Sequence, residues 1–241
     1  MNGLEIVESI EEGYASAVET AHDFLGVEPS DFNEPELRPE YLVTISIAKA
    51  FNKRNRHVRL EAPLKPILNF HRGRSKEFEP YTKKERFDLT VSEDDNEFSP
   101  ETLIEIKLNN ANEGLVTEDL NKLARVLNRF DTLKFSDRLG VFLCHFARKK
   151  SSDTSKAETL LGHLENSTKK LASTHERLNI EFGFLIQSKI TTNDSIVNIV
   201  YDDGSEEDVL GREGFIFTPG IILLSYDALP MISLSKDPEQ L

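Results

Sequence analysis

Residues 86–109 read RFDLTVSEDDNEFSPETLIEIKLN, a pattern that predicts two short β-strands joined by a polar loop. Apolar side chains fill every second position of both halves: Phe87, Leu89 and Val91, then Ile104, Ile106 and Leu108. Because side chains alternate between the two faces of a strand, each strand should have one apolar face and one ionisable face. The loop at 93–100 is rich in turn-forming residues, which favours a hairpin.

The predicted hairpin brings two carboxylates together. If the strands pair symmetrically about the loop, paired residue numbers add to 193, and Asp88 lies opposite Glu105 with Cβ atoms about 5 Å apart. Carboxylates this close repel unless a cation or a proton lies between them, and Mg²⁺ prefers carboxylate oxygens plus water. Lys107, on the face of Glu105, is placed to orient or deprotonate a water that attacks a phosphate. This placement depends on the assumed register, because a slip by one residue would move the carboxylates to opposite faces.

The spacing of these residues resembles the PD-(D/E)XK nuclease superfamily, which has the restriction-endonuclease-like fold. The resemblance rests on Asp88, sixteen further residues and then Glu105-Ile106-Lys107, with Phe87 where the motif often has proline. The family places the aspartate on its second core strand and the tripeptide on the third, before a helix and a fourth strand. Segments 117–130 and 138–146 read as that helix and that strand, so the resemblance spans residues 39–146 as an order of elements.

The resemblance implies an α/β fold. The expected architecture is a restriction-endonuclease-like central mixed sheet flanked by helices, with an N-terminal helix and a C-terminal α/β extension. The expected divisions are an N-terminal helical arm (1–34), the nuclease core (35–150), and a C-terminal helix and strands (151–241) that extend the core sheet.

The resemblance also implies an Mg²⁺-dependent endonuclease, with Mn²⁺ as a substitute. Asp88, Glu105 and the backbone carbonyl of Ile106 would hold the metal, and Lys107 would position the nucleophilic water. Glu40 stands where the family tends to carry an acidic residue on the helix before the sheet, and would reach the metal through water. DNA is the expected partner and RNA stays open. Cleavage of both strands of a duplex would suggest a homodimer.

Charge is unevenly distributed along the chain, whose net charge is −13. Residues 1–40 contain eleven acidic residues and one arginine, whereas residues 53–86 contain eleven Lys and Arg and four glutamates. The basic block suits a phosphate backbone beside the metal. It can equally be a solvated face that pairs with the acidic N-terminal region. The candidate nucleic-acid-binding residues are Arg72, Arg74, Lys76, Lys83 and Lys84, with Lys122 from the following helix.

Other interpretations stand beside this one. Asp88, Glu105 and Lys107 can form a surface salt bridge of little energetic value. Glu40 can also have a purely structural role, because the helix dipole favours a carboxylate in the first turn. A catalytically inactive interaction or regulatory protein that retains the fold is therefore the alternative function. Motifs of P-loop, α/β-hydrolase, zincin and dinucleotide-binding enzymes do not occur.

Composition narrows the class of protein further. The single Cys144 excludes an internal disulfide and a cysteine-based zinc site. No apolar run reaches the length of about 20 residues that crosses a bilayer, and the acidic first residues do not resemble a secretory signal, so a cytoplasmic protein is expected.

The rest of the chain predicts further helices and strands. Helices are expected at 3–25, 39–52, 117–130 and 152–177, and strands at 57–63, 139–146, 179–190, 196–201, 215–218 and 220–226. Residues 64–80 are expected to be irregular, residues 202–208 an acidic loop and residues 233–241 a loose tail. Asp119 and Lys122 are expected on a solvated face of their helix. A second interpretation, from the resemblance, places Lys122 near the scissile phosphate, because this helix follows the catalytic strand in the family.

Overall fold

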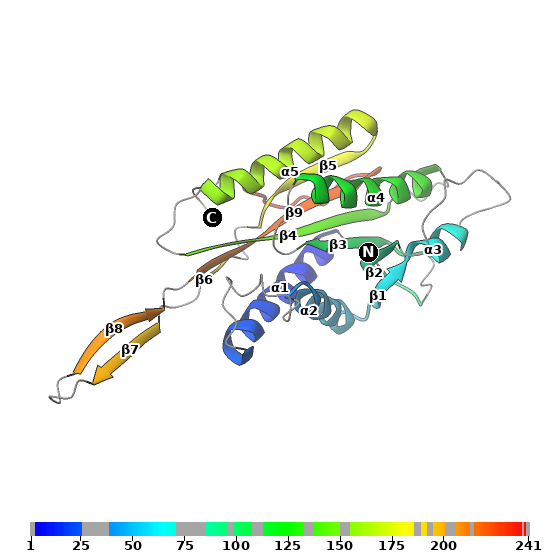
Figure 1. Cartoon of the computed structure of the whole chain (residues 1–241). Coiled ribbons are helices and arrows are strands. Elements are labelled where there is room, and N and C mark those ends of the chain that lie inside the picture. The colour runs from blue at the N-terminus through cyan, green and yellow to red at the C-terminus, as the bar shows by residue number, and fades with distance from the viewer. Residues whose placement is uncertain are drawn as a thin grey trace.

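The computed structural model of the chain describes residues 3–25, 39–70, 85–95, 99–107, 113–132, 137–149, 155–185, 189–191, 195–200, 206–212, 215–237 and 239. Its helices are α1 (Gly3–Leu25), α2 (Pro39–Lys53), α3 (Leu64–Phe70), α4 (Glu113–Thr132) and α5 (Ser155–Thr174). Its strands are β1 (His57–Pro63), β2 (Arg86–Ser92), β3 (Thr102–Lys107), β4 (Leu139–Lys149), β5 (Asn179–Phe184), β6 (Ile190–Thr191), β7 (Ser195–Val200), β8 (Glu206–Arg212) and β9 (Phe215–Ser225). The predicted α/β class is confirmed (Figure 1). None of these helices is long and apolar enough to cross a membrane.

The predicted hairpin forms and belongs to a mixed sheet. β2 and β3 pair antiparallel with residue numbers that add to 193, from Val91 opposite Thr102 to Leu89 opposite Ile104. β4 then lies parallel to β3, with α4 as the connection between them. The sheet order is β1-β2-β3-β4-β9-β5, and β6 also pairs with β9. The C-terminal strands β5, β6 and β9 therefore share the sheet of the hairpin, whereas β7 and β8 form a separate hairpin that projects from it (Figure 1).

Helices cover both faces of the sheet (Figure 1). α1 and α2 lie on one face, and their core with the sheet includes Ile10, Tyr14, Phe51, Ile104, Leu143 and Leu223. α4 and α5 lie on the other face, and their core includes Leu123, Phe130, Leu164, Leu103, Phe142 and Ile222. Because β4 is buried on both faces, its sequence is a nearly continuous apolar run from 139 to 144.

At Asp88, the alternation of side chains between the two faces of the sheet is interrupted. β1 and β2 pair on both sides of this position, but Glu61 and Asp88 themselves are missing from the ladder. Glu61 has a φ of 49°, in the left-handed region that strains a residue with a Cβ atom. Leu89 consequently packs with α1 and α2, whereas Phe87 packs with α4 and α5. The expectation that Phe87, Leu89 and Val91 share one apolar face is therefore wrong.

Two helices differ from expectation near the hairpin. Residues 64–70 form α3 and are not irregular, because Leu64 and Ile67 are buried in the core under α4. Pro66 lies in the first turn, where the helix needs no backbone N–H. α4 begins at Glu113, four residues before the predicted start of the helix at Thr117. The Thr117 hydroxyl instead donates to the Glu113 carbonyl and bonds Ser167 of α5 at 3.0 Å.

The C-terminal part also differs in detail. Residues 206–208, expected in an acidic loop, lie in β8, and the two strands expected between 215 and 226 are one strand, β9. The strand expected at 179–190 is divided into β5 and β6. Ser235, in the expected loose tail, exchanges two backbone hydrogen bonds with Phe184, so this part of the tail adds to the edge of the sheet.

Candidate active site

Six charged side chains from α2, β2, β3 and α4 meet at the end of β3. β3 ends with the predicted tripeptide, so Glu105 and Lys107 lie at the C-terminal edge of the strand. We call the six residues the acid–lysine cluster: Glu40, Asp88, Glu105, Lys107, Asp119 and Lys122. The four residues predicted as catalytic are among them.

Lys107 forms an ion pair with Glu40. The Lys107 Nζ lies 3.4 Å from Glu40 Oε1, and both side chains are about one-third exposed. Burial alone would lower the pKa of Lys107, but the surrounding carboxylates, with Glu40 foremost, raise it above its usual value. Lys107 is therefore an ammonium at neutral pH, which donates hydrogen bonds and does not act as a base. The contact brings Glu40 from the first turn of α2 to the end of β3.

Asp88 binds the strand that carries the tripeptide. Its Oδ2 accepts a hydrogen bond of 2.7 Å from the backbone N–H of Ile106. The β2–β3 ladder ends one position earlier, at Leu89 opposite Ile104. The side chain of Asp88 thus binds the backbone of Ile106, the residue after Glu105. Asp88 and Glu105 are not the pair of the β-ladder that the symmetric register had predicted.

Glu105 is the most deeply buried charged residue of the cluster, with 2% of its side chain exposed. Its Oε1 forms an ion pair with the Lys122 ammonium at 2.6 Å. Burial raises the pKa of Glu105 well above its usual range, and the Asp88 and Asp119 carboxylates add to the rise. The Lys122 ammonium acts in the opposite direction but does not cancel it. A buried carboxylate with a perturbed pKa beside other charges is typical of functional sites.

The solvated face expected for Asp119 and Lys122 is wrong. Their side chains are 13% and 15% exposed, so α4 turns them toward the sheet and not toward solvent. The Lys122 ammonium also contacts the backbone carbonyl of Arg86 at 2.9 Å. One signal was present in the sequence: Asp119 follows Val116 by three residues and precedes Leu123 by four, a spacing that places it at the edge of the buried stripe.

The charges of the cluster suit a divalent cation. Its four carboxylates exceed its two lysines, and Asp119 Oδ2 is buried with no hydrogen-bond partner in the described part of the chain. Among the residues that the structure describes, no three His, Cys, Asp or Glu side chains are grouped closely enough to hold a metal ion. A cation here would complete its ligands with backbone carbonyls, water or phosphate. Mg²⁺ is commonly held in this way, by one or two carboxylates, so the residues present fit it.

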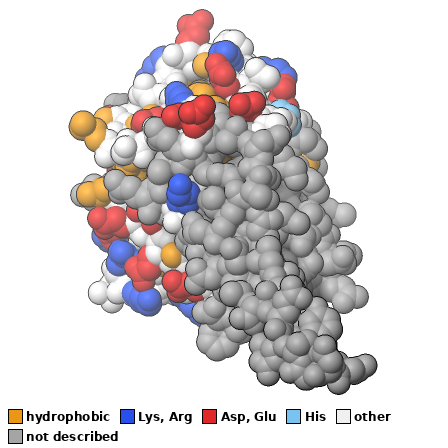
Figure 2. Space-filling model, turned by 90° about the vertical axis from the view of Figure 1, so that its left-hand side faces the viewer, with side chains coloured by type: hydrophobic (Ala, Val, Ile, Leu, Met, Phe, Trp, Pro, Cys, Tyr) orange, Lys and Arg blue, Asp and Glu red, His pale blue; other side chains and the backbone are white. Residues whose placement is uncertain are grey.

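The predicted nucleic-acid-binding residues fall mostly outside the described residues: Arg72, Arg74, Lys76, Lys83 and Lys84. Lys122 is described, but its ammonium is engaged with Glu105 and the carbonyl of Arg86. Figure 2 shows one face of the molecule, on which the described acidic and basic side chains alternate and form no continuous basic area. The predicted phosphate-binding surface therefore stays a prediction.

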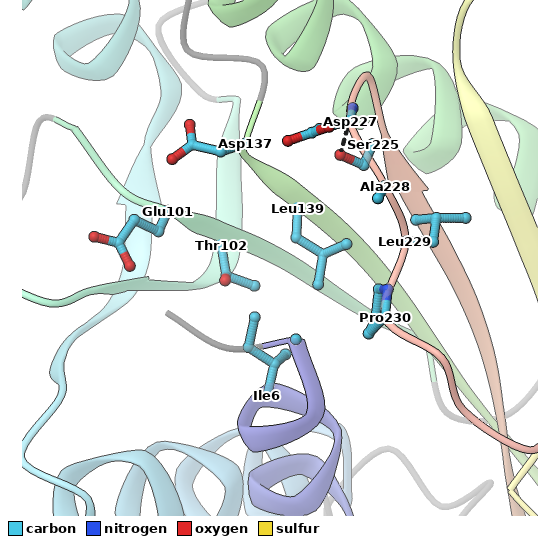
Figure 3. Close-up of a pocket in the computed structure, with 11 residues that line it drawn as sticks. Ile6, Glu101, Thr102, Asp137, Leu139, Ser225, Asp227, Ala228, Leu229 and Pro230 are labelled. Atoms are coloured by element: carbon cyan, nitrogen blue, oxygen red, sulfur yellow. Dashed lines mark hydrogen bonds between the residues drawn. The ribbon is translucent and has the colours of Figure 1, made fainter.

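A pocket of about 250 Å³ lies at the opposite end of β3 (Figure 3). Apolar side chains of Ile6, Leu139 and Leu229 line it, and acidic residues stand at its rim: Glu101, Asp137 and Asp227. The amide of Asp227 donates to Ser225 Oγ, which fixes the turn after β9. Because the rim is acidic, this pocket disfavours a phosphate, and none of the predicted site residues lines it.

Comparison with known proteins gives no match: no family model fits the sequence, and no curated protein or solved structure is significantly similar to the chain.

Proposed function

We propose that this chain is a divalent-metal-dependent nuclease that hydrolyses phosphodiester bonds, with DNA as the first substrate to test. The observation that carries the proposal is the meeting of Glu40, Asp88, Glu105 and Lys107 at one edge of a mixed sheet. The elements that hold them follow one another in the order that the PD-(D/E)XK resemblance implies. Neighbouring carboxylates beside a charged lysine are suitable groups for metal-assisted hydrolysis of a phosphate ester.

Each residue has a role that its surroundings support. Asp88, Glu105 and the backbone carbonyl of Ile106 are the proposed ligands of Mg²⁺, which would supply positive charge at the scissile phosphate. Lys107 holds the attacking water by donating a hydrogen bond and stabilises the negative charge that develops. Glu40 fixes the position of Lys107 through their ion pair. Phosphoryl transfer depends on positioning and charge neutralisation, which these roles provide.

A second candidate is a non-catalytic interaction or regulatory protein that retains the fold. The observation in its favour is the ion pair of Glu105 with Lys122, which places an ammonium where a nuclease needs the metal ion. Such a protein would bind its partner without any need for a divalent cation. Metal binding and cleavage therefore separate the two candidates.

The test is cleavage of supercoiled, linear and single-stranded DNA, and of single-stranded RNA, with Mg²⁺ or Mn²⁺ and with EDTA. We expect metal-dependent cleavage by the wild type that falls by about 100-fold or more in Asp88→Ala and Lys107→Ala, the loss typical of a removed charge-stabilising group. Lys169→Ala is the matched control, because Lys169 is 69% exposed on α5 and pairs only with the exposed Glu165 among the contacts described.

Cleavage that persists in both variants would place the chemistry elsewhere and contradict the proposal. If the wild type is inert on all substrates, calorimetric titration with Mn²⁺ decides. The absence of Mn²⁺ binding that depends on Asp88 would favour the non-catalytic protein.

A further inference from the structure

The Lys122 ammonium lies among oxygen atoms of the kinds that bind hard cations. Glu105 Oε1 is 2.6 Å away, the backbone carbonyl of Arg86 2.9 Å, and Asp119 Oδ1 3.5 Å. The ring of Phe87 lies 5.5 Å from the ammonium on another side. Two carboxylates and a carbonyl are also ligands that Mg²⁺ accepts. The Lys122 ammonium therefore lies where a metal cation could bind, and it neutralises Glu105, one of the proposed metal ligands.

The ion pair with Glu105 is suited to being exchanged. Lysine is a compact charge on a flexible stem of four carbons, which lets it reorient about a fixed helix position. Exchange of one cation for another keeps the buried carboxylate neutralised, which avoids the cost of an uncompensated buried charge.

Asp119 offers the ammonium a second carboxylate on its own helix. Asp119 precedes Lys122 by three residues, so the two side chains are neighbours on the surface of α4. Its Oδ2 is buried and has no hydrogen-bond partner among the described residues, although a buried acceptor is costly when it is unsatisfied. A lysine that leaves Glu105 would find there an acceptor with unused capacity.

We propose that Lys122 is the counter-ion of Glu105 in the metal-free protein, and that it moves to Asp119 when a divalent cation binds Glu105. This inference rests on the proposed metal-dependent function. Two residues of α4 then set the metal affinity. Lys122 competes with the metal for Glu105, and Asp119 weakens this competition by binding the Lys122 ammonium. Asp119 acts through Lys122 and is a positioning residue.

The consequence is a measurable change in metal affinity. Removal of the Lys122 charge deletes a competitor and a repulsion within a few ångströms of the metal, so we expect Lys122→Met to bind Mn²⁺ about tenfold more tightly. Asp119→Asn leaves the lysine without its second carboxylate, so we expect Mn²⁺ binding about fivefold weaker. When Lys122 is already methionine, the added Asp119→Asn should change the affinity little, because the two residues act on one ion pair.

The experiment is isothermal titration of the full chain with Mn²⁺ at one mildly alkaline pH. The variants are Lys122→Met, Asp119→Asn and their combination, with Asp88→Ala to identify the site. Lys169→Met is the control for the loss of one positive charge, because this exposed lysine lies on α5, outside the cluster. Circular dichroism checks that each variant is folded.

The outcomes separate this inference from the function on which it rests. Wild-type binding that is absent, or that survives Asp88→Ala, overturns both. Asp88-dependent binding that is unchanged or weakened by Lys122→Met overturns the role of Lys122 alone. If Lys122→Met does not fold, unchanged Mn²⁺ affinity in Asp119→Asn overturns the inference and weaker affinity supports it. An equal loss from Asp119→Asn in both backgrounds would mean that Asp119 does not act through Lys122.

Discussion

Two of the regions that contain ion pairs, the contact of α1 with residues 53–56 and the acid–lysine cluster, are built differently. In the first region, Arg56 binds both oxygens of Glu5 with hydrogen bonds of 2.7 Å, and Glu12 contacts Lys53 and Arg54 at 2.7 and 2.6 Å. The Glu5 and Arg56 side chains are 22% and 21% exposed. In the second region, the Lys122 ammonium lies 2.6 Å from Glu105, whose side chain is only 2% exposed.

The pKa values of the glutamates in the two regions therefore shift in opposite directions. Hydrogen bonds from Arg56 lower the pKa of Glu5, whereas burial raises the pKa of Glu105 above its usual range. The first region favours charged carboxylates and contributes to stability. The second holds a carboxylate in surroundings that disfavour its charge, an arrangement that stability alone does not explain and that function often requires.

The largest expected effect comes from breaking the buried pair. Lys122→Met leaves Glu105 buried beside Asp88 and Asp119 without its nearest positive charge, and we expect a loss of about 3 kcal/mol in the free energy of unfolding. Guanidinium unfolding in EDTA at neutral pH measures it. The double variant Glu105→Leu with Lys122→Met should recover most of that loss, because apolar residues of similar volume replace a buried ion pair at little cost. A double variant as unstable as the single one would show that the pair is structural.

The second effect sharpens the other side of the comparison, where α1 crosses α2 closely. A Cβ atom on Gly13 would lie 2.4 Å from the Cα of Ile47, so Gly13→Ala must push two helix backbones apart. We expect a loss of about 2 kcal/mol, measured by denaturant unfolding. Gly162→Ala on α5 is the matched control, since a Cβ there meets no atom within 4 Å and alanine favours a helix by roughly 1 kcal/mol. Equal effects at the two glycines would mean that α1 is not seated tightly.

The sequence predicted the parts of the fold and site that depend on periodic patterns. Alternation in 102–107 and the symmetric loop predicted a hairpin whose numbers add to 193, and the apolar run at 139–144 predicted a strand buried on both faces. The resemblance predicted that Glu40 and Lys107 are site residues, and the structure brings their side chains into contact.

The remaining features depend on single torsions and contacts between elements, which no periodic pattern records. Glu61 has a left-handed φ at the position where the facing of β1 and β2 changes, yet nothing in its residue type indicates this. Asp119 and Lys122 look like ordinary solvated charges until α4 is packed against β3. Their burial follows from the packing of α4 against the sheet and not from the helix sequence alone.

The smallest predicted effect tests the opposite pKa directions by their pH dependence. Glu5 has a lowered pKa in the folded protein, so its ion pair stabilises fully above the unfolded value of 4.5 and loses its contribution as pH falls through the folded value. Glu5→Gln should therefore reduce the free energy of unfolding by about 1 kcal/mol at neutral pH, and the difference from wild type should vanish in acid. Glu8→Gln, an exposed change on the same helix, is the control for the loss of one negative charge. Urea unfolding at a series of pH values measures the difference. A loss that stays constant into acid would show that Glu5 contributes by packing and not by charge, and the contrast with Glu105 would then lie in burial alone.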